Sequence, residues 1–445
     1  MSVPVEFVLF ALTLAGVALF HGRTLEVALT GLAAVLAYKL AVAGFGGVAG
    51  LAGLARHLHH EWVTLANLFC LLMGFALLSR HFEESRVPDR LPELLPDDWR
   101  GGFMLLVLVF VLSSFLDNIA AALIGGTVAA SVYQRKVHLG YLAAIVAASN
   151  AGGSGSVVGD TTTTMMWIDG VSPREVVHAY VAAVVALVVF GIPASLQQHR
   201  HQPILADARA AVPVDWGRLA VVGLILAAAI VTNVVVNVYF NGLGASFPFI
   251  GVAVWAAVLA AAPWRRPDWS VLPGTLRGTV FLLCLVLAAS LMPVDELPPA
   301  SWHTTFGLGF VSAVFDNIPL TKLALEQRGY DWGMLAYAVG FGGSMIWFGS
   351  SAGVAITNLY PEAKSVGAWL RHASALVRRM ASDLGCTVED EPVVEYWPVT
   401  IGTFWPTTMR ASSLSSVSSV GVDRMFAPAS CSSARARNAR LVIVP

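Results

Sequence analysis

Two Asp-Asn pairs inside apolar segments are the residues of this sequence best suited to chemistry. The segment SSFLDNIAAAL supplies Asp117 and Asn118, and SAVFDNIPLTKLAL supplies Asp316 and Asn317. A carboxylate beside an amide offers oxygen ligands for a hard cation, and the carboxylate can also carry a proton. A charge in an apolar environment costs free energy, so its presence twice in the same motif predicts a function.

Each pair is followed by a segment rich in glycine and hydroxyl groups, GGSGSVVGDTTTT and GGSMIWFGSSAGV. Both contain Gly-Gly-Ser and a further Gly five residues after that Ser. In this register Asp160 matches Ser350, and Thr161 matches Ser351. Such runs disfavour helix, and irregular backbone at membrane depth needs protein or a water-filled cavity around it. We therefore expect two discontinuous helices whose unwound midpoints face the Asp-Asn pairs.

The composition places these motifs in a membrane protein. The chain has 445 residues, of which 56% are hydrophobic and 12% charged, and its mean hydropathy is +0.70. An average soluble domain has about twice that charged fraction. We therefore expect an all-α integral membrane protein. The net charge of −1 gives no reason to expect a nucleic-acid partner.

The apolar runs predict where the chain crosses the membrane. The N-terminal run lacks a basic region and a cleavage site, so we expect a first transmembrane helix and not a removable signal peptide. Two of the apolar segments, 103–132 and 303–327, carry the Asp-Asn pairs. The other candidate spans lie at about 3–20, 24–43, 61–80, 141–168, 174–193, 217–239, 246–263, 274–292 and 333–359.

The two segments with Asp-Asn pairs are expected to form re-entrant hairpins. In 103–132 the arm before Asp117 has about 14 residues, or about 21 Å of helix, short of the roughly 30 Å hydrocarbon core. If the segment returns to its own side, one face gathers the arginines of the 80–100, 200–218 and 265–266 loops. The positive-inside rule then places this face in the cytoplasm and the N-terminus outside.

By the same reasoning hairpin 303–327 enters from the outer face, which is typical of inverted repeats. We place the repeats at about 61–193 and 274–371, within a transmembrane domain of residues 1–371. The remaining residues, 372–445, form a polar tail predicted to be cytoplasmic, where a last helix is expected but no run is apolar enough. A shifted reading frame, a disordered tail or a native tail would each explain it.

The paired DNI motifs and the GGSGSVVGDTTTT segment resemble the NhaD-type Na+/H+ antiporters. These belong to an ion-transporter superfamily that also includes citrate and dicarboxylate carriers, and the resemblance covers about residues 60–370. It implies that the hairpin tips and unwound helices form the transport site, that transport is by alternating access, and that the protein is a homodimer. Matched residue by residue, the implied site is Asp117, Asn118, Asn150, Asp160, Thr162, Thr163, Asp316, Asn317, Ser350 and Ser351.

The three carboxylates of this set are expected to exchange protons for a metal cation. Ionised Asp117, Asp160 and Asp316 would hold Na+ or Li+ together with amide and hydroxyl oxygens. Protonation would remove the charge that holds the ion. We expect transport and no enzyme activity, no cofactor, and small ions and the lipid of a bacterial-type inner membrane as partners.

Two alternatives stay open. A carrier of citrate or another carboxylate needs hydrogen-bond donors, and an Asp at each tip would repel the substrate unless a metal screened it. Lys322 is the fixed cation near the second tip. The other alternative is structural: Asp117, Asp160 and Asp316 would only be N-caps that satisfy backbone donors of the following half-helices.

Overall fold

The computed structural model describes residues 4–369 except 46, 157, 206–212, 241–243 and 245. Helices are the regular elements of this part of the chain, which contains no strand, and the expected all-α class is confirmed. The polar tail 372–445 lies outside the described residues.

The α-helices of the described residues follow one another along the chain. Their bounds are α1 (Val5–Leu19), α2 (Thr24–Tyr38), α3 (Gly50–Glu84), α4 (Val87–Arg90), α5 (Trp99–Ser113), α6 (Asn118–Val132), α7 (Leu139–Ser154), α8 (Thr161–Ile168), α9 (Pro173–Val177), α10 (Ala179–His201), α11 (Trp216–Tyr239), α12 (Phe249–Ala261), α13 (Leu272–Ser290), α14 (Trp302–Ser312), α15 (Asn317–Gln327), α16 (Trp332–Gly342) and α17 (Ser351–Leu359).

Five helical stretches among the described residues are long and apolar enough to cross a bilayer, so the chain is a multi-pass membrane protein. They are Thr24–Ala43, Gly50–Glu84, Pro173–His201, Trp216–Val236 and Trp269–Ser290. The span expected at 61–80 is only the middle of α3, which already begins at Gly50. Residues near position 61 therefore lie inside the bundle and not at a helix end.

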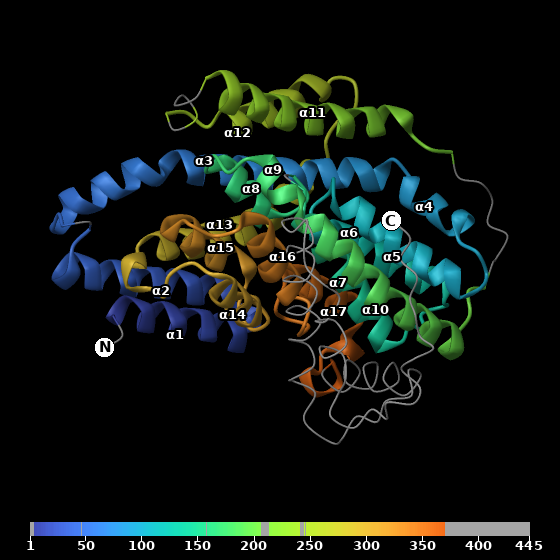
Figure 1. Ribbon diagram of the computed structural model, residues 1–445. Helices are drawn as coiled ribbons and strands as arrows, with labels where there is room; N and C mark the ends of the chain where they lie inside the picture. Colours follow the sequence, from blue (N-terminus) through green and yellow to red (C-terminus); the bar gives the residue numbers. More distant parts are fainter. Residues whose placement is uncertain are drawn as a thin grey trace, which may run out of the picture.

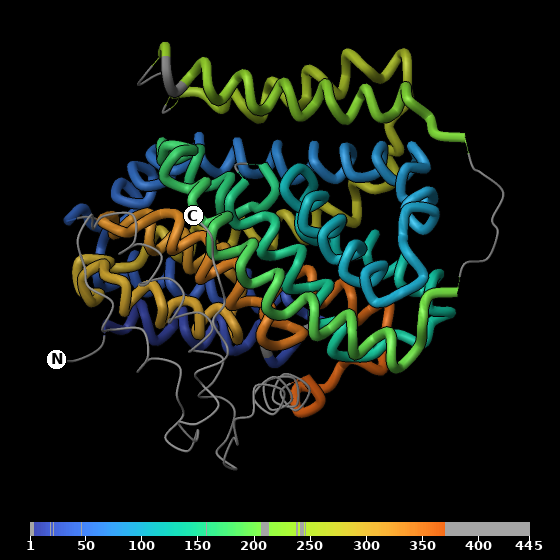
Figure 2. Tube along the Cα trace, turned by 45° about the vertical axis from the view of Figure 1, so that its right-hand side comes forward, coloured from blue at the N-terminus to red at the C-terminus, as the bar shows by residue number. Residues whose placement is uncertain are grey.

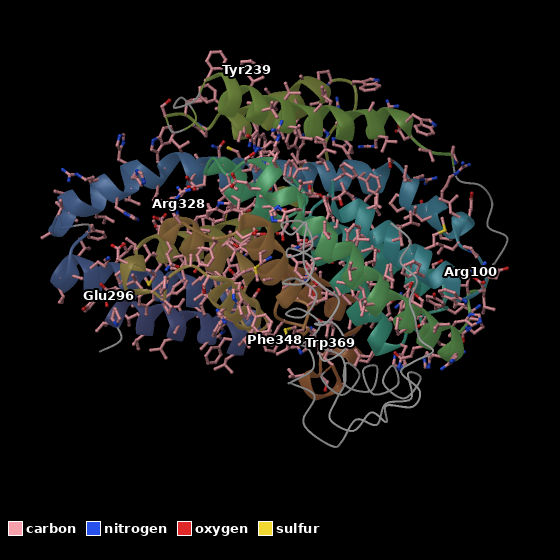
Figure 3. All side chains as sticks on the ribbon, in the orientation of Figure 1. Arg100, Tyr239, Glu296, Arg328, Phe348 and Trp369 are labelled. Carbon is pink, nitrogen blue, oxygen red and sulfur yellow. The ribbon has the colours of Figure 1, made fainter. Side chains whose placement is uncertain are left out.

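Helices α5 and α6 form a pair joined by a short turn, and α14 and α15 form a second pair. α5 and α6 have 15 residues each, or about 22 Å, so neither crosses the hydrocarbon core alone. The pairs start at opposite ends of the bundle. Arg100 in α5 marks one end and Glu296, just before α14, marks the other (Figure 3).

Helices α7 and α16 pack against each other in the centre of the bundle (Figure 1). Both are buried along nearly their whole length. One is flanked by α5 and α6, the other by α14 and α15. Small side chains in α7 allow neighbouring backbones to approach closely. Each central helix ends in its Gly-Gly-Ser motif, and a short helix, α8 or α17, begins several residues later.

The remaining long helices surround these pairs. α11 and α12 form a separate layer across α3 (Figure 2), and α2 packs on α13 at the other side. α11 and α12 expose large apolar side chains such as Leu224 and Leu259, as a surface in contact with lipid does. Of these helices, α3 and α13 lie next to the polar groups of the candidate site.

Candidate functional site

The first Asp-Asn pair lies in the turn between α5 and α6. Asp117 is the N-cap of α6, and its carboxylate accepts a hydrogen bond from the Ile119 amide at 3.2 Å. Asn118 is buried, and its side chain donates to Oδ1 of Asn150 on α7 at 3.2 Å. The turn is thereby fixed to one of the two central helices.

Hydroxyl groups hold the break between α7 and α8 against this turn. The Ser156 hydroxyl donates to the Ser114 carbonyl at 2.6 Å and accepts from two amides of the break. Asp160 ends the break as the N-cap of α8, and its carboxylate accepts from the Thr162 amide at 3.2 Å. The Gly- and Ser-rich sequence therefore satisfies backbone groups that have no helical partner.

The threonines that follow Asp160 occupy two faces of α8. Thr161 and Thr164 line a cavity, whereas Thr162 and Thr163 are fully buried behind it. The reason is the helical register, because α8 begins at Thr161 and residues three apart share a face. The cavity therefore does not receive the two threonines that were expected, and the Thr163 hydroxyl donates to the Asp160 carbonyl instead.

The second Asp-Asn pair lies in the turn between α14 and α15. Asp316 is the N-cap of α15 and accepts from the Ile318 amide at 3.0 Å. Its other carboxylate oxygen accepts from the Ser351 hydroxyl at 3.3 Å. Ser350 is the N-cap of α17 and accepts from a backbone amide of that helix. All three expected carboxylates, Asp117, Asp160 and Asp316, are thus N-caps of the helices that follow them.

Two side-chain amides join the two halves of the site. Asn317 donates to Oδ2 of Asp160 at 3.4 Å. Asn150 donates to the hydroxyls of Ser344 and Ser350, at 2.9 and 3.1 Å. Unpaired buried amides and hydroxyls cost about 1–3 kcal/mol each, so this network fixes the relative position of the halves.

The same contacts recur in the two halves. The Ser113 hydroxyl at the end of α5 donates to the Ser149 carbonyl on α7. The Ser312 hydroxyl at the end of α14 donates to the Val339 carbonyl on α16. In both cases a helix that leads to an Asp-Asn turn is tied to the central helix beside it.

The first glycines of the two Gly-Gly-Ser motifs, Gly152 and Gly342, have the same packing role in the two halves. A Cβ on Gly152 would meet the backbone carbonyl of Phe110 in α5. A Cβ on Gly342 would meet the backbone carbonyl of Gly309 in α14. Only glycine permits this approach of helix to helix.

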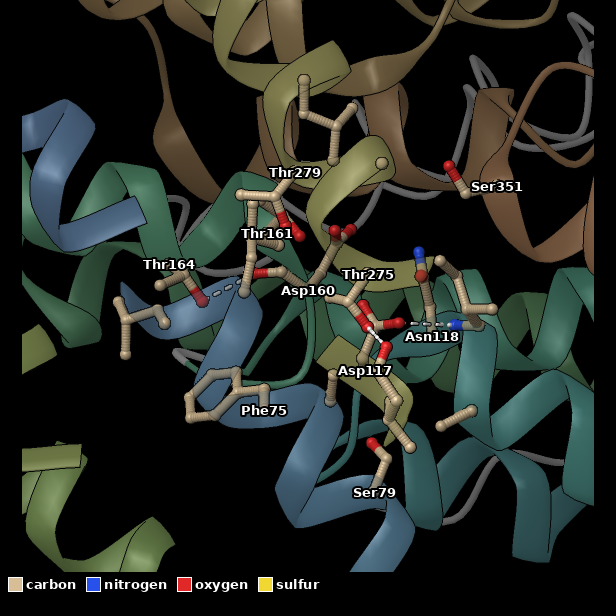
Figure 4. Close-up of a pocket in the computed structure, with 18 of the residues that line it drawn as sticks. Phe75, Ser79, Asp117, Asn118, Asp160, Thr161, Thr164, Thr275, Thr279 and Ser351 are labelled. Atoms are coloured by element: carbon tan, nitrogen blue, oxygen red, sulfur yellow. Dashed lines mark hydrogen bonds between the residues drawn. The ribbon is translucent and has the colours of Figure 1, made fainter. Parts of the chain in front are cut away.

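A cavity of about 600 Å³ reaches from the surface to the Asp-Asn turns (Figure 4). Asp117 and Asp160 both line its inner part. Arg80, Glu83 and Asp268 line its mouth, and we call this side of the bundle the Arg80 face. Of the expected site, the cavity is lined by Asp117, Asn118, Asp160, Asn317 and Ser351.

Asp316 lies in a neighbouring, smaller cavity of about 200 Å³, together with Ser350. Ser351 lines both cavities. The structure thus brings Asp117 and Asp160 together and places Asp316 on the other side of Ser351. Asn150 lines neither of these two cavities and lies behind them, where it connects the halves.

The charges of the cavity are unevenly distributed. At the mouth, Arg80 contacts Glu83 at 3.2 Å and Asp268 at 3.0 Å. The pKa of Asp268 lies below its usual value because the hydroxyl and amide of Ser270 and the Arg80 guanidinium bind its carboxylate. The inner part has the carboxylates of Asp117 and Asp160 and no Lys or Arg among the described lining residues.

Lys322 does not enter the cavity. Its ammonium contacts Oε2 of Glu61 on α3 at 2.9 Å and the carboxylate of Glu326, one turn further along α15. Glu61 was not predicted from the sequence because it lies where the expected span 61–80 begins, whereas α3 already begins at Gly50. The signal available was a single Glu at the start of the candidate span 61–80, which is equally typical of a helix end.

Comparison with known proteins relates the chain to cation exchangers. It is 26% identical over 336 residues to sodium/proton antiporter 1 of Arabidopsis thaliana, covering 67% of this chain and 55% of that protein. It is 25% identical over 356 residues to the Na+/H+ antiporter NhaD of Vibrio parahaemolyticus, and the match covers 67% of this chain and 84% of that protein. The chain therefore spans only about half the length of the plant relative.

The family model for citrate transporters, CitMHS, matches residues 4–342, which is most of the chain and includes the first pair, both central helices and the second pair. The family is one of transporters, so the expectation of a transporter and not an enzyme is confirmed. With this match and the distant similarity to NhaD antiporters, the chain belongs to the citrate transporter (CitMHS) family.

Proposed function

We propose that the protein exchanges Na+ or Li+ for H+ across a membrane by alternating access. The observation that carries the proposal is that two carboxylates, Asp117 and Asp160, lie together at the inner end of one cavity. Among the described residues that line this inner end, none is Lys or Arg. Amide and hydroxyl groups of Asn118, Asn317 and Thr161 line the same region. Such an all-oxygen set suits a hard cation.

The exchange follows from competition for the carboxylates. When Asp117 and Asp160 are ionised, they attract a cation that enters from the Arg80 face. When protons occupy them, the charge that holds the cation is gone. The carboxylates therefore bind the cation and the protons alternately. Asp316 would act in the same way in its own cavity, with the Ser350 and Ser351 hydroxyls as further ligands.

We also propose an inverted-repeat architecture with two re-entrant hairpins, α5–α6 and α14–α15, and two discontinuous helices, α7–α8 and α16–α17. The recurring serine contacts and glycine approaches support it, as do hairpin helices that start from opposite ends. Such repeats suit alternating access because the two halves can exchange conformations.

The orientation follows from loop charge. Arg80, Arg218 and Arg265 gather at the Arg80 face, where they pair with acidic neighbours. We place this face in the cytoplasm of a cell with a bacterial-type inner membrane, because basic loops are retained on the cytoplasmic side. The cavity of this structure is then open to the inside.

Citrate or another carboxylate is the second candidate, and one feature of the site favours it. The N-termini of α6, α8, α15 and α17 meet at the two turns, and helix N-termini attract anions. Three of these termini are already capped by Asp117, Asp160 and Asp316. A carboxylate would meet these charges unless a metal ion lay between, so the cation remains the better supported cargo.

The test uses inverted membrane vesicles acidified inside by respiration, with a pH-sensitive dye. NaCl, LiCl, KCl and citrate with Mg2+ are added in turn. Rapid loss of the gradient with Na+ or Li+, but not with K+, is the expected result. A response only to citrate with Mg2+ would replace the proposal by the second candidate, and vesicles without the protein are the control.

A further inference from the structure

A buried cluster of charged groups lies outside both cavities. Lys322 on α15 contacts Oε2 of Glu61 on α3 at 2.9 Å, and the side chains of both are only 4% exposed. Glu326 contacts the same ammonium and is 29% exposed. Charges this deeply buried are costly, and removing one partner of such a pair is strongly destabilising because it leaves an uncompensated buried charge. The cluster therefore has a strong effect on which arrangement of α3 and α15 is stable.

The cluster lies beyond the inner end of the main cavity. On α3 the cavity runs from Arg80 at the mouth to Leu68, and Glu61 is seven residues further, or about 10 Å. On α15 the cavity ends near Asn317 and Ile318, and Lys322 is about one turn further. Both helices thus place their charged residue between the candidate site and the face opposite Arg80.

Further polar groups continue from the cluster toward that opposite face. His57, one turn before Glu61 on α3, makes a 2.9 Å hydrogen bond with the Ser290 hydroxyl at the end of α13. Lys39 donates to the Leu291 carbonyl at 2.8 Å. Polar side chains therefore continue from the cluster toward the face opposite Arg80, and the nearly inaccessible Glu61–Lys322 contact lies between them and the candidate site.

The two carboxylates of the cluster differ in one decisive respect. Glu326 is on the same helix as Lys322, four residues further, so it moves together with the ammonium. Glu61 is on another helix, so its contact breaks whenever α15 moves relative to α3. The Glu61–Lys322 contact links two helices, whereas the Glu326–Lys322 contact lies within α15.

We propose that the Glu61–Lys322 pair is a gate that closes the side opposite the Arg80 face and opens when the cavity on the Arg80 face closes. The gate rests on the proposed alternating access, and it sets the balance of the two states without binding the ion. When it opens, Lys322 keeps Glu326 as its partner, so the ammonium is never left buried and alone. Glu61 becomes the first carboxylate on the route from that side.

Two single-cysteine reporters follow the two sides of the gate. Thr275 lines the cavity near its mouth, and Thr321, next to Lys322, is fully buried. T275C and T321C are made separately in a chain whose four native cysteines are replaced. The proteins are placed in nanodiscs, where both faces are accessible, in choline chloride without Na+, Li+ or citrate. The labelling rate by a charged thiol reagent is measured.

Glu61→Gln removes the link between helices, and Glu326→Gln is the matched control that removes a charge partner of the same lysine. E61Q is expected to slow labelling of T275C and to speed that of T321C, whereas E326Q changes both much less. A tenfold shift of an equilibrium that starts near ten to one slows T275C labelling about twofold. The exchange of both charges, E61K with K322E, is made in the E326Q background, because Glu326 would otherwise repel a carboxylate at position 322, and it is expected to restore the rates measured in E326Q.

Every outcome has a distinct meaning. Unchanged labelling of both reporters in E61Q, or equal effects of E61Q and E326Q, would overturn the gate. Faster labelling of both reporters in E61Q indicates a loosened fold, and the charge exchange then decides: failure to restore the rates also overturns it. Because labelling needs no transported ion, a failure of the Na+/H+ proposal in vesicles is independent of this result.

Discussion

Replacing Asp117 by asparagine separates the two roles that its position allows. Asparagine caps helices as well as aspartate does, so the hydrogen bond from the Ile119 amide is kept. What is lost is the negative charge at the inner end of the cavity. We therefore expect D117N to insert and fold normally and to bind Na+ poorly.

The size of the loss follows from the distance between ion and carboxylate. A cation about 4 Å from a carboxylate gains roughly 4 kcal/mol at an effective dielectric constant near 20. Removal of water from both groups offsets part of this gain, so a net loss of about 2–3 kcal/mol is expected. The NaCl concentration for half-maximal exchange then rises about 30- to 150-fold.

Two measurements check this prediction. Dye recovery in inverted vesicles gives the half-saturating NaCl concentration, and the apparent melting temperature in detergent gives stability. D117A is the matched control, because alanine removes the cap as well and is expected to lower stability by about 1 kcal/mol. If D117N keeps the wild-type Na+ dependence and only D117A changes anything, Asp117 is a cap and no more.

Two further predictions concern packing and the mouth of the cavity. Gly342→Ala is expected to lower the melting temperature in detergent, because its Cβ would meet the Gly309 carbonyl. Gly274→Ala is the control and is expected to leave the melting temperature unchanged, because the space around Gly274 is open. Equal effects of the two substitutions would contradict the packing. Asp268→Asn is expected to leave the pH profile of exchange unchanged between about pH 6 and 9. The hydrogen bonds from Ser270 lower the pKa of Asp268, so its carboxylate stays ionised over this pH range. Its contacts with Ser270 and Arg80 are lost only as the pH falls through that lowered pKa. A shifted profile, measured in vesicles, would refute this.

The parts of the site that the sequence predicted are those marked by local contrast. Asp117 and Asp316 are charges in apolar runs, and the Gly-Gly-Ser motifs interrupt helices by their own backbone preferences. The structure places these residues at the helix pairs and at the ends of α7 and α16. Local chemistry was enough to find them.

The parts that were not predicted depend on register and on distant partners. Which threonines face the cavity depends on the residue at which α8 begins, and a shift of one position exchanges Thr161 for Thr162. The Glu61–Lys322 pair joins residues 261 positions apart. No periodicity reports such a contact, so Lys322 could not be assigned a partner before the helices were placed.

The central claim is that a cation and a proton compete for the same carboxylates, and proton release tests it most directly. NaCl is added to the purified protein in weakly buffered detergent solution, and the pH is followed. We predict that Na+ or Li+ releases protons, that the release saturates at the concentration that saturates exchange, and that the D117N/D160N/D316N variant, which lacks all three carboxylates, releases none. Binding of Na+ without proton release, or a response only to citrate with Mg2+, would contradict the account.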